Sequence, residues 1–532
     1  MTGNTDTPSA LDVQPGSHES PGPLPDSSER LWLQWLPLAL ASVAIALCVF
    51  WATFHPGVDE EVYQYVGYAW FAKHYRLYRD VFENKPPGVY LVWGLAWLAG
   101  DGKPFLGRLA GVIASCVAAL LMARLAGRVW GRELSVLAAA LLLAATCSGH
   151  LSFPFGDTEA FGVPLVLGGI CLAWPRGGKP VSAVAALLSG LLCGLAMLFK
   201  QTFVIELVVA MALAAQGAQA IRQRMAQGAT VLGGALVPLL VCAACFAAEG
   251  ILDDAFDATV ISVLQPGNCP SAGLWQRLPT AVLKVLRLLD APVVLLLCGL
   301  AVYSLVELRR TQNRAVAATC LVWIAAVVLA IGVQGWAWSH QVRQLLPPLC
   351  LLAVGALGYP DAPEPLALAA VHARRRLAGY FAVVAMSLSI VATASNALEA
   401  RHAGQTARGH AAAVEAIQSL TGPDDRIWCY PRRDLYVRAR RSSGIRYTTS
   451  LVLMRPGAQE EVLAGLGSGT VRLVAIHWVD VQGGRDVDHA FAGDVRIAFQ
   501  RKLAAVLAEH FAFRCRAGDW DLFEFRSEQA PP

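Results

Sequence analysis

The sequence predicts an α-helical polytopic membrane protein with about eleven transmembrane helices, followed by a small C-terminal extracytoplasmic α/β domain. Of its 532 residues, 55% are hydrophobic and only 15% are charged, whereas a soluble domain carries about a quarter of its residues as Asp, Glu, Lys and Arg. Apolar runs long enough to cross about 30 Å of hydrocarbon recur as far as Leu398. Beyond Leu398 the composition becomes that of a soluble domain.

Residues 1–30 are predicted to be a disordered cytoplasmic tail, because they are rich in Pro, Ser, Gly and Asp. The apolar run Leu31–Phe54 is too long for a signal-peptide core and is expected to be an uncleaved first span. We expect the transmembrane domain to occupy 31–398, with a large first outer loop at 55–104. The further spans are expected near 105–127, 134–150, 159–174, 182–199, 202–217, 229–248, 290–306, 315–333, 343–359 and 378–396.

Basic residues on alternate connections predict the orientation. They are Arg124, Arg128 and Arg132; Arg176 and Lys179; Arg222 and Arg224; Arg309, Arg310 and Arg314; and Arg374, Arg375 and Arg376. The positive-inside rule makes that side cytoplasmic, with the N-terminus inside and the C-terminal domain outside. Heavy use of Ala, Leu, Arg and Gly favours a bacterial source, hence the cytoplasmic (inner) membrane. A net charge of +4 does not suggest a nucleic-acid partner.

The first outer loop opens with the acidic run Asp59-Glu60-Glu61. The segment Val62–Tyr78 that follows has aromatic residues at roughly helical spacing, which predicts an interfacial amphipathic helix lying on the membrane. Asp59 and Glu60 could serve chemistry, or they could simply place favourable charge at a helix N-terminus.

A second polar group, Glu83 to Gly88, contains Lys85-Pro86-Pro87 and precedes the apolar stretch Val89–Ala99. That stretch is too short to span a membrane and is expected to form an interfacial or re-entrant helix. An ammonium beside a helix start, with free N–H groups, suits a lipid phosphate. The alternative is that Lys85 is a lysine that snorkels to the interface.

Three further polar groups fall on the same predicted outer side. Asp157 and Glu159 begin one span, and Asp157 could equally cap that helix. Lys200 with Gln201 ends another span, and Glu206 follows a little deeper. His340 and Arg343 share a helix face before a later span. Ionisable residues at such depths indicate a functional site, and several groups on one face strengthen that inference.

The pattern resembles the GT-C glycosyltransferases, in the branch of protein O-mannosyltransferases and lipid A aminoarabinose transferase. The residues that carry the resemblance are Asp59-Glu60 after the first span, Lys85-Pro86-Pro87, Arg108 at the start of the next span, Lys200-Gln201, and His340 before a Pro-rich span. The likeness covers roughly residues 31–400 and is most specific in the first outer loop. It departs at position 341, where relatives often have tyrosine and this chain has Gln341.

The resemblance implies an inverting transfer of a sugar from a polyprenyl-phosphate-linked donor to an acceptor hydroxyl on the outer face of the membrane. It implies that Asp59 is the catalytic carboxylate, with Glu60 beside it, and that Lys85 binds the donor phosphate, assisted by Arg108 or Arg343. Asp157, Glu159, Lys200 and His340 would form a supporting polar site. The acceptor could be a lipid, a glycan or a protein.

The chemistry is consistent with these roles, because a lipid phosphate leaves without a proton and one base for the acceptor suffices. The sequence contains no glycine-rich phosphate-binding loop, so it gives no indication of a nucleotide-sugar donor. No cofactor is required, although a divalent cation could be held by Asp59, Asp157 and Glu159. The main alternative is a polytopic transporter of a polar or lipid-linked solute, which usually shows internal repeats that this chain lacks. A non-catalytic scaffold is a third alternative.

The C-terminal domain, residues 399–532, alternates helical and strand-like segments. Helices are expected at His410–Leu420, Glu460–Leu466 and Ala490–Glu509, and strands at Arg426–Tyr430, Val471–His477, Phe511–Arg516 and Trp520–Phe525. A stabilising cap over the site is the favoured role. Of the 13 cysteines, all but Cys269, Cys429 and Cys515 lie in or beside apolar segments, and Cys429 with Cys515 could form a disulfide.

Overall fold

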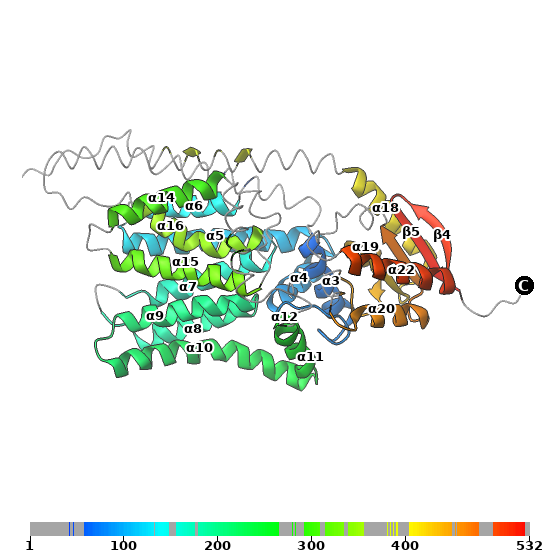
Figure 1. Ribbon diagram of the computed structural model, residues 1–532, viewed down its shortest axis with the longest axis horizontal. Coiled ribbons are helices and arrows are strands. Elements are labelled where there is room, and N and C mark those ends of the chain that lie inside the picture. Colours follow the sequence, from blue (N-terminus) through cyan, green and yellow to red (C-terminus); the bar gives the residue numbers. More distant parts are fainter. Residues whose placement is uncertain are drawn as a thin grey trace, which may run out of the picture.

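The computed structural model describes residues 58–131, 134–147, 156–175, 179–264, 292–308, 314–334, 339–355, 404–449, 455–477 and 493–526, with a few single positions between them. Two parts of the molecule lie at opposite ends of its long axis: a bundle of apolar helices and a C-terminal region with a sheet (Figure 1). Helices α3 and α4 lie between them. The predicted tail at 1–30, most of Leu31–Phe54 and most of 378–396 lie outside the described residues.

The helical bundle follows the predicted apolar runs. Its helices are α5 (Phe105–Val129), α6 (Ser135–Thr146), α7 (Thr158–Ala173), α8 (Ala183–Met197), α9 (Val204–Gln216), α10 (Ile221–Ala248), α14 (Pro292–Leu308), α15 (Arg314–Gln334) and α16 (Leu346–Gly355). Each lies on a predicted span, so the helical class is confirmed. Within the described ranges, three helices are long and apolar enough to cross a membrane: Phe105–Val129, Ile221–Ala248 and Arg314–Gly332. The expected total of about eleven spans remains a prediction.

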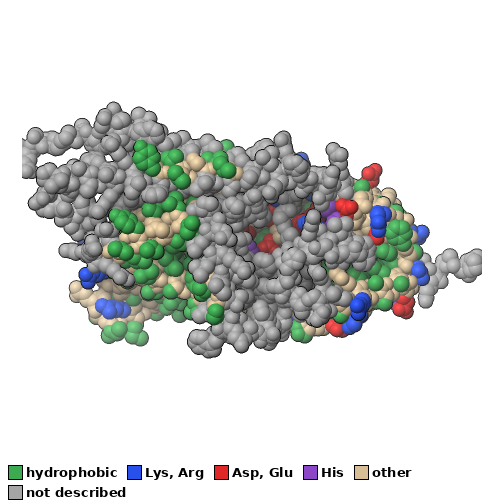
Figure 2. Space-filling model, turned by 45° about the horizontal axis from the view of Figure 1, so that its top comes forward, with side chains coloured by type: hydrophobic (Ala, Val, Ile, Leu, Met, Phe, Trp, Pro, Cys, Tyr) green, Lys and Arg blue, Asp and Glu red, His purple; other side chains and the backbone are tan. Residues whose placement is uncertain are grey.

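The bundle packs closely where small residues meet. A Cβ at Gly190 of α8 would lie 1.8 Å from the carbonyl oxygen of Val231 in α10. A Cβ at Gly234 of α10 would lie 2.1 Å from the carbonyl oxygen of Leu187. Small residues that let two backbones approach are typical of helix pairs in membranes. On the face seen in Figure 2, hydrophobic side chains are prominent over the described part of the bundle, as expected for a surface in contact with lipid.

Helices α3 (Val58–Lys73) and α4 (Gly88–Gly100) are formed by the first outer loop. The prediction of a surface helix over Val62–Tyr78 is wrong in two respects. The helix ends at Lys73, because His74 has a left-handed backbone with φ of 56°. Of its predicted aromatic residues, Tyr63 is also buried within the protein instead of lying at the headgroups, whereas Trp70 and Tyr75 are half-buried. The predicted short helix after Pro87 is present as α4, and its place in the membrane stays a prediction.

The C-terminal region contains a mixed five-stranded sheet in the order β2-β1-β3-β5-β4. The strands are β1 (Arg426–Tyr430), β2 (Ser442–Ser443), β3 (Leu473–His477), β4 (Phe511–Ala517) and β5 (Trp520–Phe525). The helices of the region are α18 (Gly404–Leu420), α19 (Asp434–Ala439), α20 (Ala458–Gly467) and α22 (Gly493–His510). Strand β1 is parallel to β2 and β3, whereas β5 is antiparallel to β3 and β4. The predicted helices and strands are present in the predicted order, but α19 and β2 were not predicted, and the domain boundary at residue 399 remains a prediction.

The suggested disulfide between Cys429 and Cys515 is wrong, because both are free cysteines. The register explains why. Cys429 in β1 pairs with Ala475 in β3, which pairs with Leu522 in β5, which pairs with Cys515 in β4. Strands lie about 4.8 Å apart, so three strand spacings separate the two cysteines. A disulfide requires Cα atoms within about 7 Å.

One hydrophobic core joins α3 and α4 to the C-terminal region. It contains Tyr65 and Trp93 from the first outer loop together with Trp428, Tyr436 and Trp520 from the C-terminal region. The rings of Tyr65 and Tyr436 stack with centroids 4.4 Å apart. The first outer loop is therefore fixed to the C-terminal region on one side and to the helical bundle on the other.

Candidate active site

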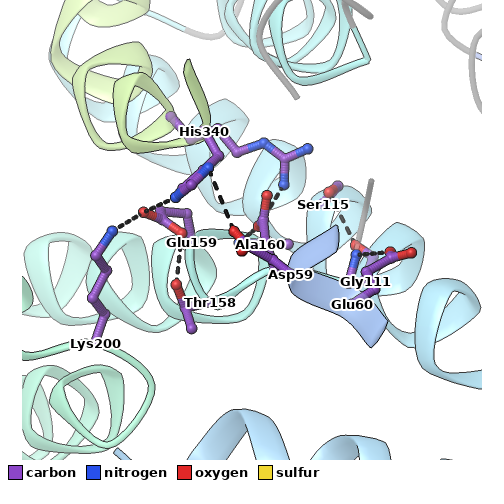
Figure 3. Close-up of polar contacts among 12 residues, drawn as sticks. Asp59, Glu60, Gly111, Ser115, Thr158, Glu159, Ala160, Lys200 and His340 are labelled. Atoms are coloured by element: carbon purple, nitrogen blue, oxygen red, sulfur yellow. Dashed lines mark hydrogen bonds and ion pairs between the residues drawn. The ribbon is translucent and has the colours of Figure 1, made fainter. Parts of the chain in front are cut away.

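The carboxylate of Asp59 lies in the first turn of α3 and remains accessible, with 47% of its side chain exposed. Its oxygen Oδ2 lies 4.0 Å from Nδ1 of His340, which belongs to the 3₁₀ helix η7 (Ser339–Leu345). Within the described part of the chain, His340 is its one ion-pair partner. Figure 3 shows the two side chains turned toward one another. A half-exposed carboxylate with few partners can accept a proton from a bound molecule.

His340 also faces Glu159, and so it lies between two carboxylates (Figure 3). Its Nε2 lies 3.9 Å from Oε1 of Glu159. Glu159 is fully buried, forms a close ion pair with Lys200, and accepts a hydrogen bond of 2.6 Å from the hydroxyl of Thr158. Because Lys200 itself is 3% exposed, the two charges neutralise each other inside the protein.

Asp59 and Lys85 both act electrostatically on His340, so both charges lie in its neighbourhood. Burial lowers the pKa of His340 below its ordinary value. Glu159 and Asp59 oppose that shift, whereas Lys200 and Lys85 add to it. Burial thus disfavours the charged form of this imidazole relative to a free histidine.

Glu60 points away from Asp59 and connects three elements. Nε of Arg108, in α5, donates to Oε2 of Glu60 at 2.7 Å, and the backbone N–H of Gly156 donates to its Oε1 at 3.1 Å. The indole N–H of Trp93, in α4, donates to the carbonyl oxygen of Gly156 at 2.9 Å. This close approach requires glycine at position 156, because a Cβ there would lie only 2.4 Å from the Trp93 ring.

Asp157 caps α7, as one reading of the sequence expected, and it also holds an arginine. Its Oδ1 accepts one hydrogen bond from the backbone N–H of Ala160 at 2.8 Å and another from Nη1 of Arg343 at 2.9 Å. Both Asp157 and Arg343 are 2% exposed. Two of the cations expected near a donor phosphate, Arg108 and Arg343, are thus each engaged with a buried carboxylate.

Lys85 differs from those cations. Its Nζ donates to Oδ1 of Asn84 at 3.0 Å, its side chain is partly exposed, and no described carboxylate lies within ion-pair distance of it. The hydroxyl of Tyr78 donates a hydrogen bond to the backbone carbonyl oxygen of Lys85 at 3.0 Å. The Gly88 N–H at the start of α4 donates to the carbonyl oxygen of Leu198 at 2.7 Å, so that group is not free for a phosphate, contrary to the expectation from sequence.

The structure adds residues that sequence reasoning missed. Tyr63 is buried among Asp59, Glu159, Asp157 and Glu83, and burial together with these carboxylates raises its pKa well above the ordinary value. Glu83 is also buried, and burial raises its pKa. Position in the sequence gave no signal for Tyr63, because its spacing fits a simple apolar helix face.

Two further expected residues sit at the edge of this arrangement. The amide of Gln201 donates to the carbonyl oxygens of Asn84 at 3.0 Å and Thr259 at 2.8 Å, and so it fixes the backbone beside Lys85. Glu206 is buried one helix away in α9. Near the middle of the face in Figure 2, acidic, basic and histidine side chains are visible in a hollow.

The three carboxylates considered for a divalent cation, Asp59, Asp157 and Glu159, form no metal-binding group with other described residues. Asp157 and Glu159 already face Arg343 and Lys200. A cation there would compete with these ion pairs, so the donor set fits a metal poorly.

Comparisons with known proteins give a family match over part of the chain and a similar fold. Residues 84–246 match the family model of dolichyl-phosphate-mannose-protein mannosyltransferase. The fold is similar to that of ArnT from Cupriavidus metallidurans bound to undecaprenyl phosphate, with a TM-score of 0.58, 13% identity, and coverage of 93% of this chain and 99% of that chain. The apo form of ArnT gives 0.58, 12% identity, and 93% and 98% coverage.

A weaker likeness is to the archaeal oligosaccharyltransferase AglB from Archaeoglobus fulgidus, with a TM-score of 0.49, 11% identity, and coverage of 93% of this chain and 75% of that chain. Among curated protein sequences, no significant match was found. Over the end of the first outer loop and the helices that follow it, the chain thus resembles the dolichyl-phosphate-mannose-protein mannosyltransferase family, and its fold is similar to that of ArnT.

Proposed function

We propose that this protein transfers a sugar from a polyprenyl-phosphate carrier to an acceptor hydroxyl, with inversion at the anomeric carbon, on the outer face of the membrane. One observation carries the proposal. Asp59 and Lys85 are the partly exposed charges around His340, whereas the other charges of the site are paired internally.

The reaction requires a base and a cation, and Asp59 and Lys85 supply them. Asp59 takes the proton of the acceptor hydroxyl, and the acceptor oxygen then bonds to the anomeric carbon of the sugar. The bond from that carbon to the phosphate oxygen breaks, and its electron pair stays on the polyprenyl phosphate. Lys85 stabilises the negative charge that develops there, an effect of about 3 kcal/mol in comparable sites.

The internally paired residues hold these two groups in place. Arg108 fixes Glu60 beside Asp59, and Arg343 fixes Asp157 at the start of α7. His340 lies between Asp59 and Glu159 and limits where the Asp59 carboxylate can move. We therefore propose positioning roles for Glu60, Arg108, Asp157, Glu159, Lys200, His340 and Arg343. ArnT, which has the same fold, has been crystallised with undecaprenyl phosphate, and this favours a carrier of that class here.

The purified full-length chain in liposomes tests the proposal. It would be supplied with undecaprenyl-phosphate-linked pentoses and hexoses, together with extracted envelope lipids and glycans as acceptors. We expect release of undecaprenyl phosphate and a glycosylated product of inverted anomeric configuration with at least one donor. Absence of release with every donor, from protein that still binds undecaprenyl phosphate, would contradict the proposal.

A further inference from the structure

Three consecutive acids open α3, and each faces a different part of the protein. Asp59 faces His340, and Glu60 accepts hydrogen bonds from Arg108 and Gly156. Glu61 faces the C-terminal region. Successive residues of an α-helix are about 100° apart around its axis, so a run of three can contact three separate neighbours. The sequence and the proposed reaction leave Glu61 without a role.

Glu61 is held by the loop that follows β1. Its Oε1 accepts a hydrogen bond from Nη1 of Arg432 at 3.0 Å, and its Oε2 accepts one from the backbone N–H of Arg433 at 3.4 Å. The Glu61 side chain is 3% exposed. A carboxylate buried this deeply needs these donors, because loss of them would leave it unsatisfied inside the protein.

The same face of α3 continues into the C-terminal region one turn later. Tyr65 lies four residues after Glu61, stacks on Tyr436 of α19, and its hydroxyl accepts the backbone N–H of Ser443 at 3.0 Å. Residues four apart share a helix face. Glu61 and Tyr65 therefore form one continuous contact between α3 and the C-terminal region, and Glu61 is its end nearest to Asp59.

We propose that Glu61 is a positioning residue through which the C-terminal region sets the place of Asp59 for sugar transfer; this inference rests on the proposed function. Asp59 itself makes few contacts within the described structure, so its position depends on its two neighbours. Glu60 fixes the first turn of α3 to the helical bundle, and Glu61 fixes it to the C-terminal region. A displacement of about 1 Å at a reacting group can reduce a rate by about 100-fold.

The test compares variants in the liposome assay. Glu61→Ala removes the contact, whereas Glu61→Gln keeps one acceptor oxygen, for either Arg432 or the Arg433 N–H, and places its amide NH2 toward the other donor. The matched control is Arg440→Ala, which breaks another ion pair between the C-terminal region and the first outer loop. That pair joins Arg440 NH2 to Asp101 Oδ2 at 2.7 Å, with side chains 59% and 74% exposed, and it does not touch the first turn of α3.

We expect Glu61→Ala to lower kcat by about 10- to 100-fold with donor KM changed by less than about 3-fold. Glu61→Gln, which keeps one of the two acceptor oxygens, should recover part of kcat, and Arg440→Ala should stay within about 2-fold of the wild type. Equal kcat for Glu61→Ala and the wild type would overturn the inference. So would equal losses in Glu61→Ala and Arg440→Ala. If Glu61→Ala does not fold, Arg432→Ala replaces it in the test. We expect Arg432→Ala to lower kcat by about 5-fold or more. An unchanged kcat in Arg432→Ala would overturn the inference.

Two readouts separate this inference from the proposed function. A wild type without transfer activity refutes the proposed function before any variant is compared. Binding of undecaprenyl phosphate to Glu61→Ala is expected to match that of the wild type, because Lys85 is unchanged. A variant that loses transfer and binding together would show general damage to the site and would overturn the positioning role.

Discussion

Nε of Arg108 donates to Oε2 of Glu60 at 2.7 Å, and the two side chains are only 5% and 0% exposed. This pair connects α5 of the helical bundle to the helix that carries Asp59. A buried ion pair adds little net stability, but removal of one partner leaves a buried charge without compensation. The pair therefore fixes geometry, and its disruption should be costly.

Replacement of Arg108 by Met tests that cost. We expect a loss of about 3–5 kcal/mol in the free energy of unfolding, seen as a lower midpoint of thermal unfolding in detergent. The double variant Arg108→Met with Glu60→Gln should regain part of that midpoint, because no buried charge remains. An Arg108→Met protein as stable as the wild type would show that the pair is dispensable.

Lys85 is expected to bind the carrier phosphate directly. Lys85→Ala should weaken the binding of undecaprenyl phosphate by about 10- to 100-fold, measured by titration of the purified protein, and Lys85→Arg should recover part of it. Lys103, an exposed lysine of the same outer loop, provides the control. Lys103→Ala should bind as the wild type does, and equal effects of the two alanine variants would argue against a specific role for Lys85.

Gly156 has no room for a side chain. A Cβ at this position would lie 2.4 Å from Cζ2 of Trp93 and 3.0 Å from Oε1 of Glu60. Gly156→Ala should destabilise the protein by about 1–3 kcal/mol and reduce transfer. Gly233 of α10 has nothing within 4 Å of such a Cβ, so Gly233→Ala should preserve both stability and transfer. If Gly156→Ala matches the wild type in stability and transfer, the backbone around residue 156 must be able to move away from Trp93 and Glu60.

The contact at Glu61 should depend on pH. Burial and the nearby Asp434 raise the pKa of Glu61 to about 7, although Arg432 and Arg433 oppose the shift. Because the pKa is higher in the folded protein, Glu61 contributes its full stabilisation of the fold below its ordinary pKa near 4.5. This contribution to the free energy of unfolding is lost as pH rises to about 7. The unfolding midpoint of Glu61→Gln relative to the wild type should thus increase from pH 4.5 to pH 7 and level off above it. A difference that stays constant with pH would contradict this shift.

Much of the fold is readable from the sequence because its signals are local. Strands Arg426–Tyr430 and Trp520–Phe525 have the predicted bounds, and the helices of the bundle follow the apolar runs. The end of α3 is not readable from the sequence because it falls at His74, a left-handed residue that is neither Gly nor Pro. The buried state of Tyr65 is not readable from local signals, because the residues it packs against, Tyr436 and Ser443, lie far away in the sequence.

Within the site, sequence patterns found the residues but not their partners. Asp157 was expected to cap α7 and does so, but no local pattern pairs it with Arg343, 186 residues later. The pairing of Glu60 with Arg108 is hidden in the same way. Because Arg108 and Arg343 are engaged with these partners, the expected phosphate contact stays with Lys85, and the assistance expected from the two arginines is not favoured.

The most direct test of the central claim is sugar transfer by Asp59→Asn in liposomes, alongside the wild type, with an undecaprenyl-phosphate-linked sugar as donor. Asn cannot accept the proton of the acceptor hydroxyl, so we expect release of undecaprenyl phosphate to fall by at least about 100-fold while its binding, which depends on Lys85, is retained. Transfer by Asp59→Asn at the wild-type rate would contradict the claim that Asp59 is the base.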